Sequence, residues 1–312
     1  MMNALVTGVA GFIGSTLAER LCGDGAHVVG LDCFTDYYPR PIKERNLSML
    51  RGLSNFRFVE SSIQRADLSV LLAGRTHVFH LAAQPGVRKS WGRDFSVYTE
   101  NNVEATQILL EACIGQPIQK IVFASSSSVY GDLVALPMRE DALPQPVSPY
   151  GVSKLAAEQL CFLYHVNYGL PTVSLRYFTV YGPRQRPDMG FHKFLRATID
   201  GEPIVIFGDG EQTRDFTFVT DAVNATIAAA VRGAAGRVYN IGGGSRVTVN
   251  DVLEMIARVS GIRPLVQSDS AQRGDMRHTC ADTGLARTDL GFNPAVSLEE
   301  GLAAEYQWLV NT

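Results

Sequence analysis

A tyrosine and a lysine stand four positions apart, at Tyr150 and Lys154, near the start of a predicted helix. Positions i and i+4 share one face of a helix, so the ammonium group lies beside the phenol. A neighbouring positive charge favours the phenolate, so the pKa of the tyrosine falls and the phenol becomes a usable base near neutral pH. Tyr–Lys pairs are also common on helix surfaces, so the pair alone leaves a catalytic and a surface interpretation open.

A run of four serines, Ser125 to Ser128, directly follows an apolar stretch at 120–124 that reads as a strand. In an open α/β sheet, ligands bind at the ends of the strands, and a serine hydroxyl there could hold a substrate hydroxyl. The same run could also be only a polar loop.

Three glycines, Gly8, Gly11 and Gly14, form a G-x-x-G-x-x-G turn between a predicted strand at 4–6 and a helical pattern at 12–22. Glycines let the backbone pass close to a pyrophosphate, and the helix N-terminus supplies free N–H groups. The second predicted strand ends near Asp32, whose carboxylate can accept ribose hydroxyls and would repel a 2′-phosphate. The turn therefore predicts a dinucleotide site that favours NAD over NADP.

The elements that must position these residues alternate between short apolar runs and amphipathic stretches. Strand-like runs at 4–6, 27–31, 56–59, 77–80 and 120–124 are separated by helical patterns, among them 12–22 and 101–113. This alternation predicts βαβ units and a parallel sheet. A long helix is expected from Ser148, a good N-cap, and Pro149 to about residue 168, followed by a strand at 172–175. After about residue 180, Gly and Pro become more frequent.

The expected fold class is therefore α/β, a Rossmann-type doubly wound parallel sheet with a smaller α+β substrate-binding portion. We place the dinucleotide-binding domain at residues 1–180 and the substrate-binding portion at 181–312, with a soft and interleaved boundary.

The composition limits the classes of function. The 312 residues include 28 basic and 31 acidic side chains, a net charge of −3, so no general attraction to nucleic acid is expected. The five cysteines form no C-x-x-C pair and the six histidines no H-x-x-x-H spacing, so neither a disulfide framework nor a metal site is expected. No secretory signal is apparent and no apolar run reaches the roughly 20 residues of a membrane span. A cytoplasmic protein without a membrane segment is predicted.

The motifs occur in a recognisable order: the glycine turn, Asp32, His80-Leu81-Ala82-Ala83, Asn101-Asn102-Val103, the serine run and Tyr150-x-x-x-Lys154. Over essentially the whole chain they resemble the extended short-chain dehydrogenases/reductases of the NAD-dependent nucleotide-sugar epimerase/dehydratase family. The resemblance implies that Tyr150 is the base on the sugar 4-hydroxyl, that Ser126 shares its proton network, and that Lys154 binds the nicotinamide ribose. One departure is Ser62, where the family commonly has an acidic residue that contacts adenine. The cofactor residues implied are Gly8, Gly11, Phe12, Ile13, Gly14, Asp32, Leu81, Ala82, Ala83, Asn101, Tyr150 and Lys154.

Two longer stretches, 177–189 and 84–91, are similar to those of UDP-glucuronate 4-epimerases. This likeness implies a substrate with a carboxylate on C5, contacted by Thr179 with Arg186 or Arg88 nearby. It further implies that Phe207 packs near the uracil, that Arg214 meets the diphosphate, and that Arg273 and Asp275 close over the nucleotide. The substrate residues implied are Pro85, Gly86, Arg88, Ser127, Ser128, Thr179, Arg186, Phe207, Arg214, Arg273 and Asp275.

The predicted reaction is the interconversion of UDP-glucuronate and UDP-galacturonate through a 4-keto intermediate. Ser127 and Ser128 are poor acids and bases at neutral pH, which disfavours dehydration. A UDP-glucose 4-epimerase, a UDP-glucuronate decarboxylase and, from another class, a non-catalytic NAD-binding regulator remain as alternatives. The resemblance also implies a homodimer through the helices that begin near Asn101 and Pro149.

Overall fold

Seven strands form the central sheet, and every pair of neighbours in it is parallel. The computed structural model describes residues 2–132, 134–270, 274 and 276–312. The strand order is β10-β6-β5-β4-β1-β2-β3. The chain adds β2 and β3 on one side of β1 and then β4, β5 and β6 on the other, so the strand order reverses between β1 and β4. Ligands of such sheets bind outside the carboxyl ends of the strands at that reversal. The strands are β1 (Asn3–Thr7), β2 (His27–Asp32), β3 (Phe56–Glu60), β4 (His77–His80), β5 (Lys120–Ser126), β6 (Thr172–Tyr177) and β10 (Val238–Ile241).

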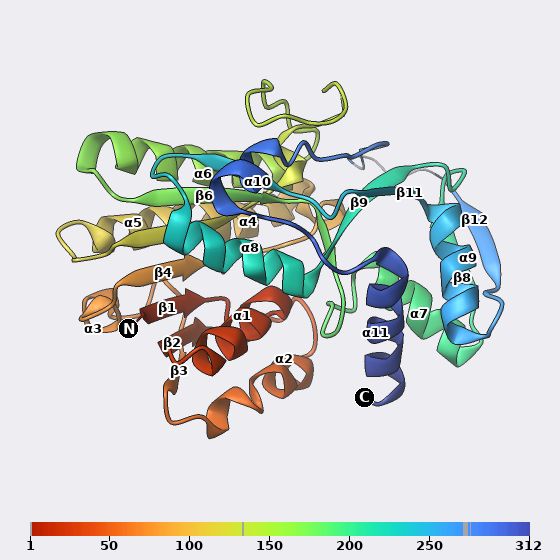
Figure 1. Ribbon diagram of the computed structural model, residues 1–312, viewed down its shortest axis with the longest axis horizontal. Coiled ribbons are helices and arrows are strands. Elements are labelled where there is room, and N and C mark those ends of the chain that lie inside the picture. The colour runs from red at the N-terminus through yellow and green to blue at the C-terminus, as the bar shows by residue number, and fades with distance from the viewer. Residues whose placement is uncertain (1, 133, 271–273, 275) are drawn as a thin grey trace.

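Helices cover both faces of this sheet, so the predicted Rossmann-type fold is confirmed (Figure 1). Side chains alternate along β1: Ala4 and Val6 pack into one apolar core, and Leu5 packs into the other. The first core lies under α1 (Phe12–Gly23), α2 (Arg40–Leu47), α8 (Val219–Arg232) and α10 (Gly284–Leu290). The second lies under α3 (Leu68–Leu72), α5 (Ala105–Cys113) and α6 (Pro149–Tyr168).

A smaller α+β portion lies beside the sheet, at the right of Figure 1. Because α8 and β10 return to the large sheet, the chain crosses between the two portions more than once. The portion contains a three-stranded sheet of β7 (Thr179–Tyr181), β9 (Thr213–Phe218) and β11 (Ser245–Thr248), and the parallel pair β8 (Ile204–Phe207) and β12 (Val266–Asp269). Its helices are α7 (Gly190–Asp200), α9 (Val249–Ser260) and α11 (Leu298–Val310).

Two helical segments position the chemistry of the sequence motifs. The helix α6 begins as predicted: the Ser148 hydroxyl accepts a hydrogen bond from the Gly151 N–H, Pro149 fills the first turn, and Gly169 ends the helix with φ +69°. The helix expected at 101–113 differs. It begins earlier, at α4 (Phe95–Tyr98), and residues 99–104 form a wider π-helical turn before α5.

Within the described part of the chain, no helix is long and apolar enough to cross a bilayer. The five cysteines are unpaired. Among the same residues, no group of three or more His, Cys, Asp or Glu side chains is placed so that it could hold a metal ion.

Candidate active site

The turn after β1 places glycine backbone directly against other backbone. Gly8 has φ +73°, and a Cβ built there would lie 2.7 Å from the Ala82 nitrogen. A Cβ at Gly14 would lie 2.2 Å from the Gly8 carbonyl oxygen. The helix α1 then begins at Phe12 without a side chain capping its N-terminus. The turn is therefore shaped as a cradle in which free N–H groups can hold a pyrophosphate.

Asp32, at the end of β2, joins this cradle to the loop that follows the strand. One carboxylate oxygen accepts the Ala10 N–H at 3.0 Å, and the other accepts the Phe34 N–H at 2.8 Å. Burial raises the pKa of Asp32, against the lowering effect of these N–H groups and of Lys43. Each carboxylate oxygen can accept more than one hydrogen bond, so capacity remains for the ribose hydroxyls expected there.

One cavity of about 430 Å³ joins the cradle to the serine run. The lining includes all twelve residues that the sequence implied for the cofactor, and also Ser126. Residues 61–64 line it as well, so Ser62, the departure from the family pattern, lies at the cavity. These residues fit an extended dinucleotide with its pyrophosphate at the glycine turn. The lining also includes the substrate candidates Pro85, Gly86, Ser127, Ser128, Thr179 and Arg186.

The π-helical turn at 99–104 places two adjacent asparagines in different surroundings. Asn101 lines the cavity. Asn102 is buried, accepts the Gln84 N–H at 2.7 Å, and donates to the Gln84 carbonyl and to the Ser153 hydroxyl. The loop after β4 is thereby tied to α6. Single π-turns of this kind are frequent at functional sites.

The three residues with catalytic potential meet where β5 ends against the first turns of α6. The helix and the serine run are in backbone contact, because a Cβ at Gly151 would lie 2.4 Å from the Ser128 carbonyl oxygen. Ser126 and Tyr150 line the same cavity, and the Ser126 hydroxyl accepts the Ser128 N–H at 3.1 Å. The Lys154 ammonium is buried and lies 4.4 Å from the centre of the Phe123 ring. The structure thus brings Ser126, Tyr150 and Lys154 together in the lining of one cavity.

The electrostatics of this group differ from the expectation that Lys154 lowers the pKa of Tyr150. Burial raises the pKa of Tyr150, and the groups that oppose this rise are the Ser126 hydroxyl and the Arg186 guanidinium. Burial also lowers the pKa of Lys154 to about 8. The sequence spacing showed the pair of Tyr150 and Lys154 but not that both are buried in apolar surroundings. It also did not show that the guanidinium of Arg186, 36 positions after Tyr150, lies close to the phenol.

The cavity continues into a second one of about 170 Å³, whose lining shares Val87, Ser127, Ser128 and Thr179 with the first. Arg214 lines this second cavity, and one of its terminal nitrogens donates to the Thr213 and Arg277 carbonyls. A nucleotide portion of a ligand could therefore extend from the serine run toward Arg214.

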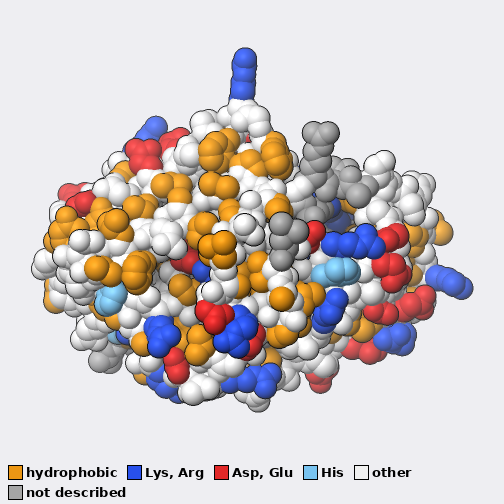
Figure 2. Space-filling model, turned by 90° about the horizontal axis from the view of Figure 1, so that it is seen from above, with side chains coloured by type: hydrophobic (Ala, Val, Ile, Leu, Met, Phe, Trp, Pro, Cys, Tyr) orange, Lys and Arg blue, Asp and Glu red, His pale blue; other side chains and the backbone are white. Residues whose placement is uncertain are grey.

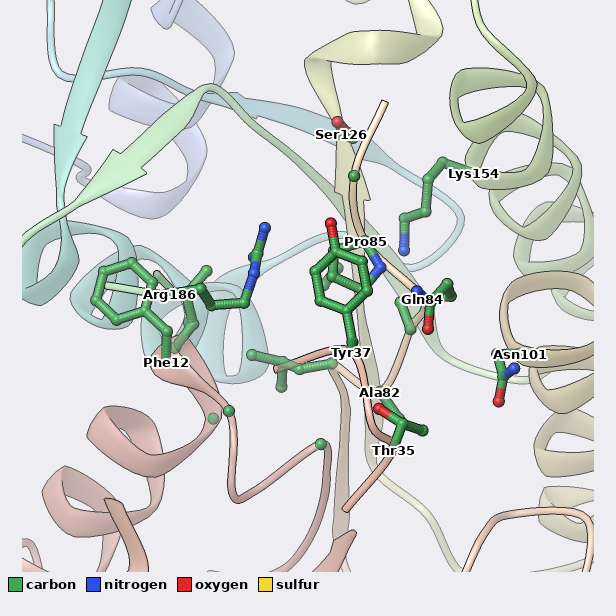
Figure 3. A pocket seen from close by; sticks show the side chains of 18 of the residues that line it. Phe12, Thr35, Tyr37, Ala82, Gln84, Pro85, Asn101, Ser126, Lys154 and Arg186 are labelled. Atoms are coloured by element: carbon green, nitrogen blue, oxygen red, sulfur yellow. The ribbon is translucent and has the colours of Figure 1, made fainter. Parts of the chain in front are cut away.

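Arg186 enters the first cavity from the loop after β7. Figure 3 shows its guanidinium and the Lys154 ammonium reaching in from opposite sides. Its Nε and Nη2 donate to the two carboxylate oxygens of Asp188, at 2.9 and 3.1 Å. The Tyr37 phenol donates to the same carboxylate at 3.1 Å. The positive charge of Arg186 is thus held beside Tyr150 by a defined network.

Two of the described substrate candidates, Arg88 and Phe207, are not in the lining of either cavity. The Arg88 guanidinium lies 4.2 Å from the centre of the Phe207 ring, so these two side chains pack on each other, and neither is in the lining. The sequence placed Arg88, as an alternative to Arg186, near the carboxylate and Phe207 near the uracil, and in the structure both side chains lie outside the lining of the two cavities. Arg273 and Asp275 lie outside the described residues.

Sequence reasoning missed Tyr37 and Gln84, which line the first cavity, and Asp188, which hydrogen-bonds to Arg186 and Tyr37. Asp188 lies two positions after Arg186, within a stretch already noted, and an acidic residue so close to a candidate arginine was the available signal. Tyr37 carries no such signal, because its partner Asp188 is 151 positions away.

Comparison with known proteins gives a consistent result. The profile of the NAD dependent epimerase/dehydratase family matches residues 4–242. An uncharacterized UDP-glucose epimerase of Bacillus subtilis is 44% identical, over 99% of this chain and 98% of that protein. A UDP-glucuronate 4-epimerase of Thermodesulfobacterium geofontis is 37% identical, over 97% and 95%.

Among solved structures, that of UDP-glucuronic acid 4-epimerase from Bacillus cereus in complex with UDP-glucuronic acid and NAD superimposes with a TM-score of 0.97. It is 45% identical and the match covers 99% of each chain. Together with the glycine cradle and the Ser126, Tyr150 and Lys154 group, these matches show that the chain belongs to the NAD dependent epimerase/dehydratase family.

Proposed function

We propose that this protein is an NAD-dependent UDP-glucuronate 4-epimerase that interconverts UDP-glucuronate and UDP-galacturonate. The observation that carries the proposal is the composition of the sugar end of the cavity. The hydroxyls of Ser127, Ser128 and Thr179 and the guanidinium of Arg186 line the same cavity as Tyr150. A carboxylate on C5 of the sugar would find there hydrogen-bond donors and a positive charge. The five unpaired cysteines suit the reducing cytoplasm.

NAD, when held by the glycine cradle, Asp32 and Lys154, would supply the hydride acceptor for C4 of the sugar and the hydride donor to the opposite face of the 4-keto sugar. Tyr150 takes the proton of the 4-hydroxyl, and the Ser126 hydroxyl, which lines the same cavity, keeps the proton within reach for its return. Lys154 would hold the hydroxyls of the nicotinamide ribose. Arg186 contributes a positive charge that opposes the pKa-raising effect of burial on Tyr150.

Arg186 also affects whether the sugar loses its C5 carboxylate as CO2. A 4-keto sugar with a carboxylate on C5 is a β-keto acid, and its charge moves into the ring as CO2 leaves. Hydrogen bonds from Arg186 would stabilise the charge on the carboxylate before that step and so oppose CO2 loss. Ser127 and Ser128 offer no acid or base that would assist elimination of water.

The product identifies the reaction. We expect UDP-glucuronate, incubated with the NAD-loaded protein and followed by proton NMR, to give UDP-galacturonate. Release of UDP-xylose would instead identify a decarboxylase, and no turnover of any UDP-sugar a non-catalytic protein. The name of the Bacillus subtilis relative makes UDP-glucose the necessary comparison substrate. A higher kcat/KM for UDP-glucose would reassign the protein as a UDP-glucose 4-epimerase.

We also propose a homodimer formed through α5 and α6, which pack side by side. The outer face of α6 exposes large apolar side chains, and Figure 2 shows hydrophobic groups gathered over the side where Figure 1 places α6. Leu163→Glu with Val166→Glu should convert a dimer to a monomer in light scattering coupled to gel filtration. A monomeric unmodified protein would refute this proposal. The exposed residues are Val152, Phe162, Leu163, Val166 and Tyr168.

A further inference from the structure

Three side chains from two distant segments of the chain form a connected network, and two of them, Tyr37 and Arg186, line the cavity. Asp188 is the centre: it accepts a fork of two hydrogen bonds from Arg186, at 2.9 and 3.1 Å, and a third from the Tyr37 phenol, at 3.1 Å. The Arg186 and Asp188 side chains are only 21% and 26% exposed. The proposed reaction assigns no task to Tyr37 or Asp188.

We propose that Asp188, held by Tyr37, is a positioning residue that orients Arg186 toward the sugar carboxylate and thereby sets the preference for acidic over neutral UDP-hexoses. This inference rests on the function proposed above. A guanidinium has five N–H donors in one plane, and the fork on Asp188 uses two of them. The fork fixes that plane while the other donors stay available for a second carboxylate.

The backbone that carries Arg186 is anchored independently of this network. The Gly182 N–H donates to the buried Glu305 carboxylate at 2.8 Å. Gln185, itself buried, accepts the His192 N–H at 2.8 Å. Loss of the Asp188 carboxylate should therefore release the guanidinium without releasing the loop.

The Tyr37 phenol can occupy its place beside Asp188 because residue 86 is a glycine. Gly86 has φ +99°, and a Cβ built there would lie 2.2 Å from the Tyr37 phenol oxygen. The Lys89 ammonium lies 4.9 Å from the centre of the Tyr37 ring. Tyr37 also belongs to the loop that starts at Asp32, so the network links the dinucleotide end of the cavity to its sugar end.

The chain contains a matched control for this arrangement. Arg139 forms the same two-residue-spaced fork on Asp141, with both distances at 3.1 Å. That pair is 64% and 70% exposed. Replacement of Asp141 by Asn therefore removes the same type of ion pair at a place outside the cavity lining.

The test measures the affinity for two ligands that differ only in the C5 group. Asp188→Asn, Tyr37→Phe and Asp141→Asn are each made in a Tyr150→Phe background, which suppresses turnover. The NAD-saturated proteins are titrated with UDP-glucuronate and UDP-glucose by calorimetry. We expect Asp188→Asn to weaken UDP-glucuronate binding about tenfold, the size of the loss of a charge-assisted hydrogen bond. Tyr37→Phe should weaken it about threefold, the size of the loss of a neutral hydrogen bond. UDP-glucose binding should stay within about twofold throughout, and Asp141→Asn should change neither. The double variant Asp188→Asn/Tyr37→Phe should match Asp188→Asn alone, because Tyr37 acts through Asp188.

Three results would overturn the inference. Equal weakening of both ligands would mean that Asp188 only stabilises the loop, and unchanged affinity for both would mean that the network does not set the preference. Tighter UDP-glucuronate binding by Asp188→Asn would mean that Asp188 merely competes with the substrate for Arg186. A parallel Arg186→Ala variant separates these from a failure of the proposed function. If Arg186→Ala leaves the selectivity unchanged, the carboxylate contact of Arg186 itself is wrong.

Discussion

The two ends of the cavity are formed by different kinds of contact. At the dinucleotide end, the critical contacts are between backbone atoms: Gly8 against Ala82, and Gly14 against the carbonyl of Gly8. At the sugar end, side chains converge from separate segments, as Tyr37 and Arg186 do on Asp188. Backbone contacts tolerate no added atoms, whereas a side-chain constellation can be tuned one functional group at a time. The first end is thus suited to a constant ligand and the second to substrate choice.

The largest effect is expected at the sugar end, from the group placed to move a proton. Tyr150→Phe keeps the ring but removes the phenol, so we predict a fall in kcat of about 10²- to 10⁴-fold with NAD still bound. Single-turnover kinetics on UDP-glucuronate would measure it. A variant that retains wild-type kcat would exclude Tyr150 as the base.

Lys154 lies where the two ends meet, and its burial should cost stability. Its folded pKa of about 8 is below the ordinary value of 10.5, so the unfolded chain binds more protons between these pH values. The stability of the protein should therefore rise with pH across that window. We predict that Lys154→Met is inactive but up to about 3 kcal/mol more stable at pH 7. Urea unfolding should show this advantage shrinking as the pH rises toward 10.5. An advantage that is equal at both pH values would contradict the pKa assignment.

The dinucleotide end is tested by adding one carbon atom. Gly14→Ala places a Cβ against the Gly8 carbonyl, so the cradle must shift, and we predict that the Kd for NAD rises about 10- to 100-fold, the scale of roughly 1–3 kcal/mol of overpacking. Gly23→Ala, at the other end of the same helix, meets nothing within 4 Å and serves as the control. Fluorescence titration with NAD would compare them. Equal Kd values would show that the close approach at Gly14 is not needed.

A smaller effect of the same kind is expected at the sugar end. Gly86→Ala displaces the Tyr37 phenol and also strains the backbone at φ +99°. Gly92→Ala has a comparable φ of +68° but meets nothing within 4 Å, so it reports the strain alone. We predict that KM for UDP-glucuronate rises about three- to tenfold in Gly86→Ala and less than twofold in Gly92→Ala. Similar KM values in both would assign the effect to strain.

The sequence predicted the dinucleotide end well because its parts are contiguous. The glycine turn and the strand that ends at Asp32 are each encoded within a few residues. The sugar end was predicted only in part. The fork between Arg186 and Asp188 spans two positions, but the contact to Tyr37 joins residues 151 positions apart. The stacking of Arg88 on Phe207 likewise depends on tertiary packing that no local pattern reveals. The π-turn at 99–104 was missed because its amphipathic spacing resembles that of an α-helix.

The central claim is that the hydride removed from C4 of UDP-glucuronate stays on the bound NAD and returns to the opposite face of the 4-keto sugar. The C5 carboxylate is retained throughout. UDP-glucuronate carrying deuterium at C4 tests this directly when its product is followed by NMR. The account predicts UDP-galacturonate that retains deuterium at C4 and carries its C5 carboxylate. Deuterium washed out into water, or a product that has lost the carboxylate, would contradict it.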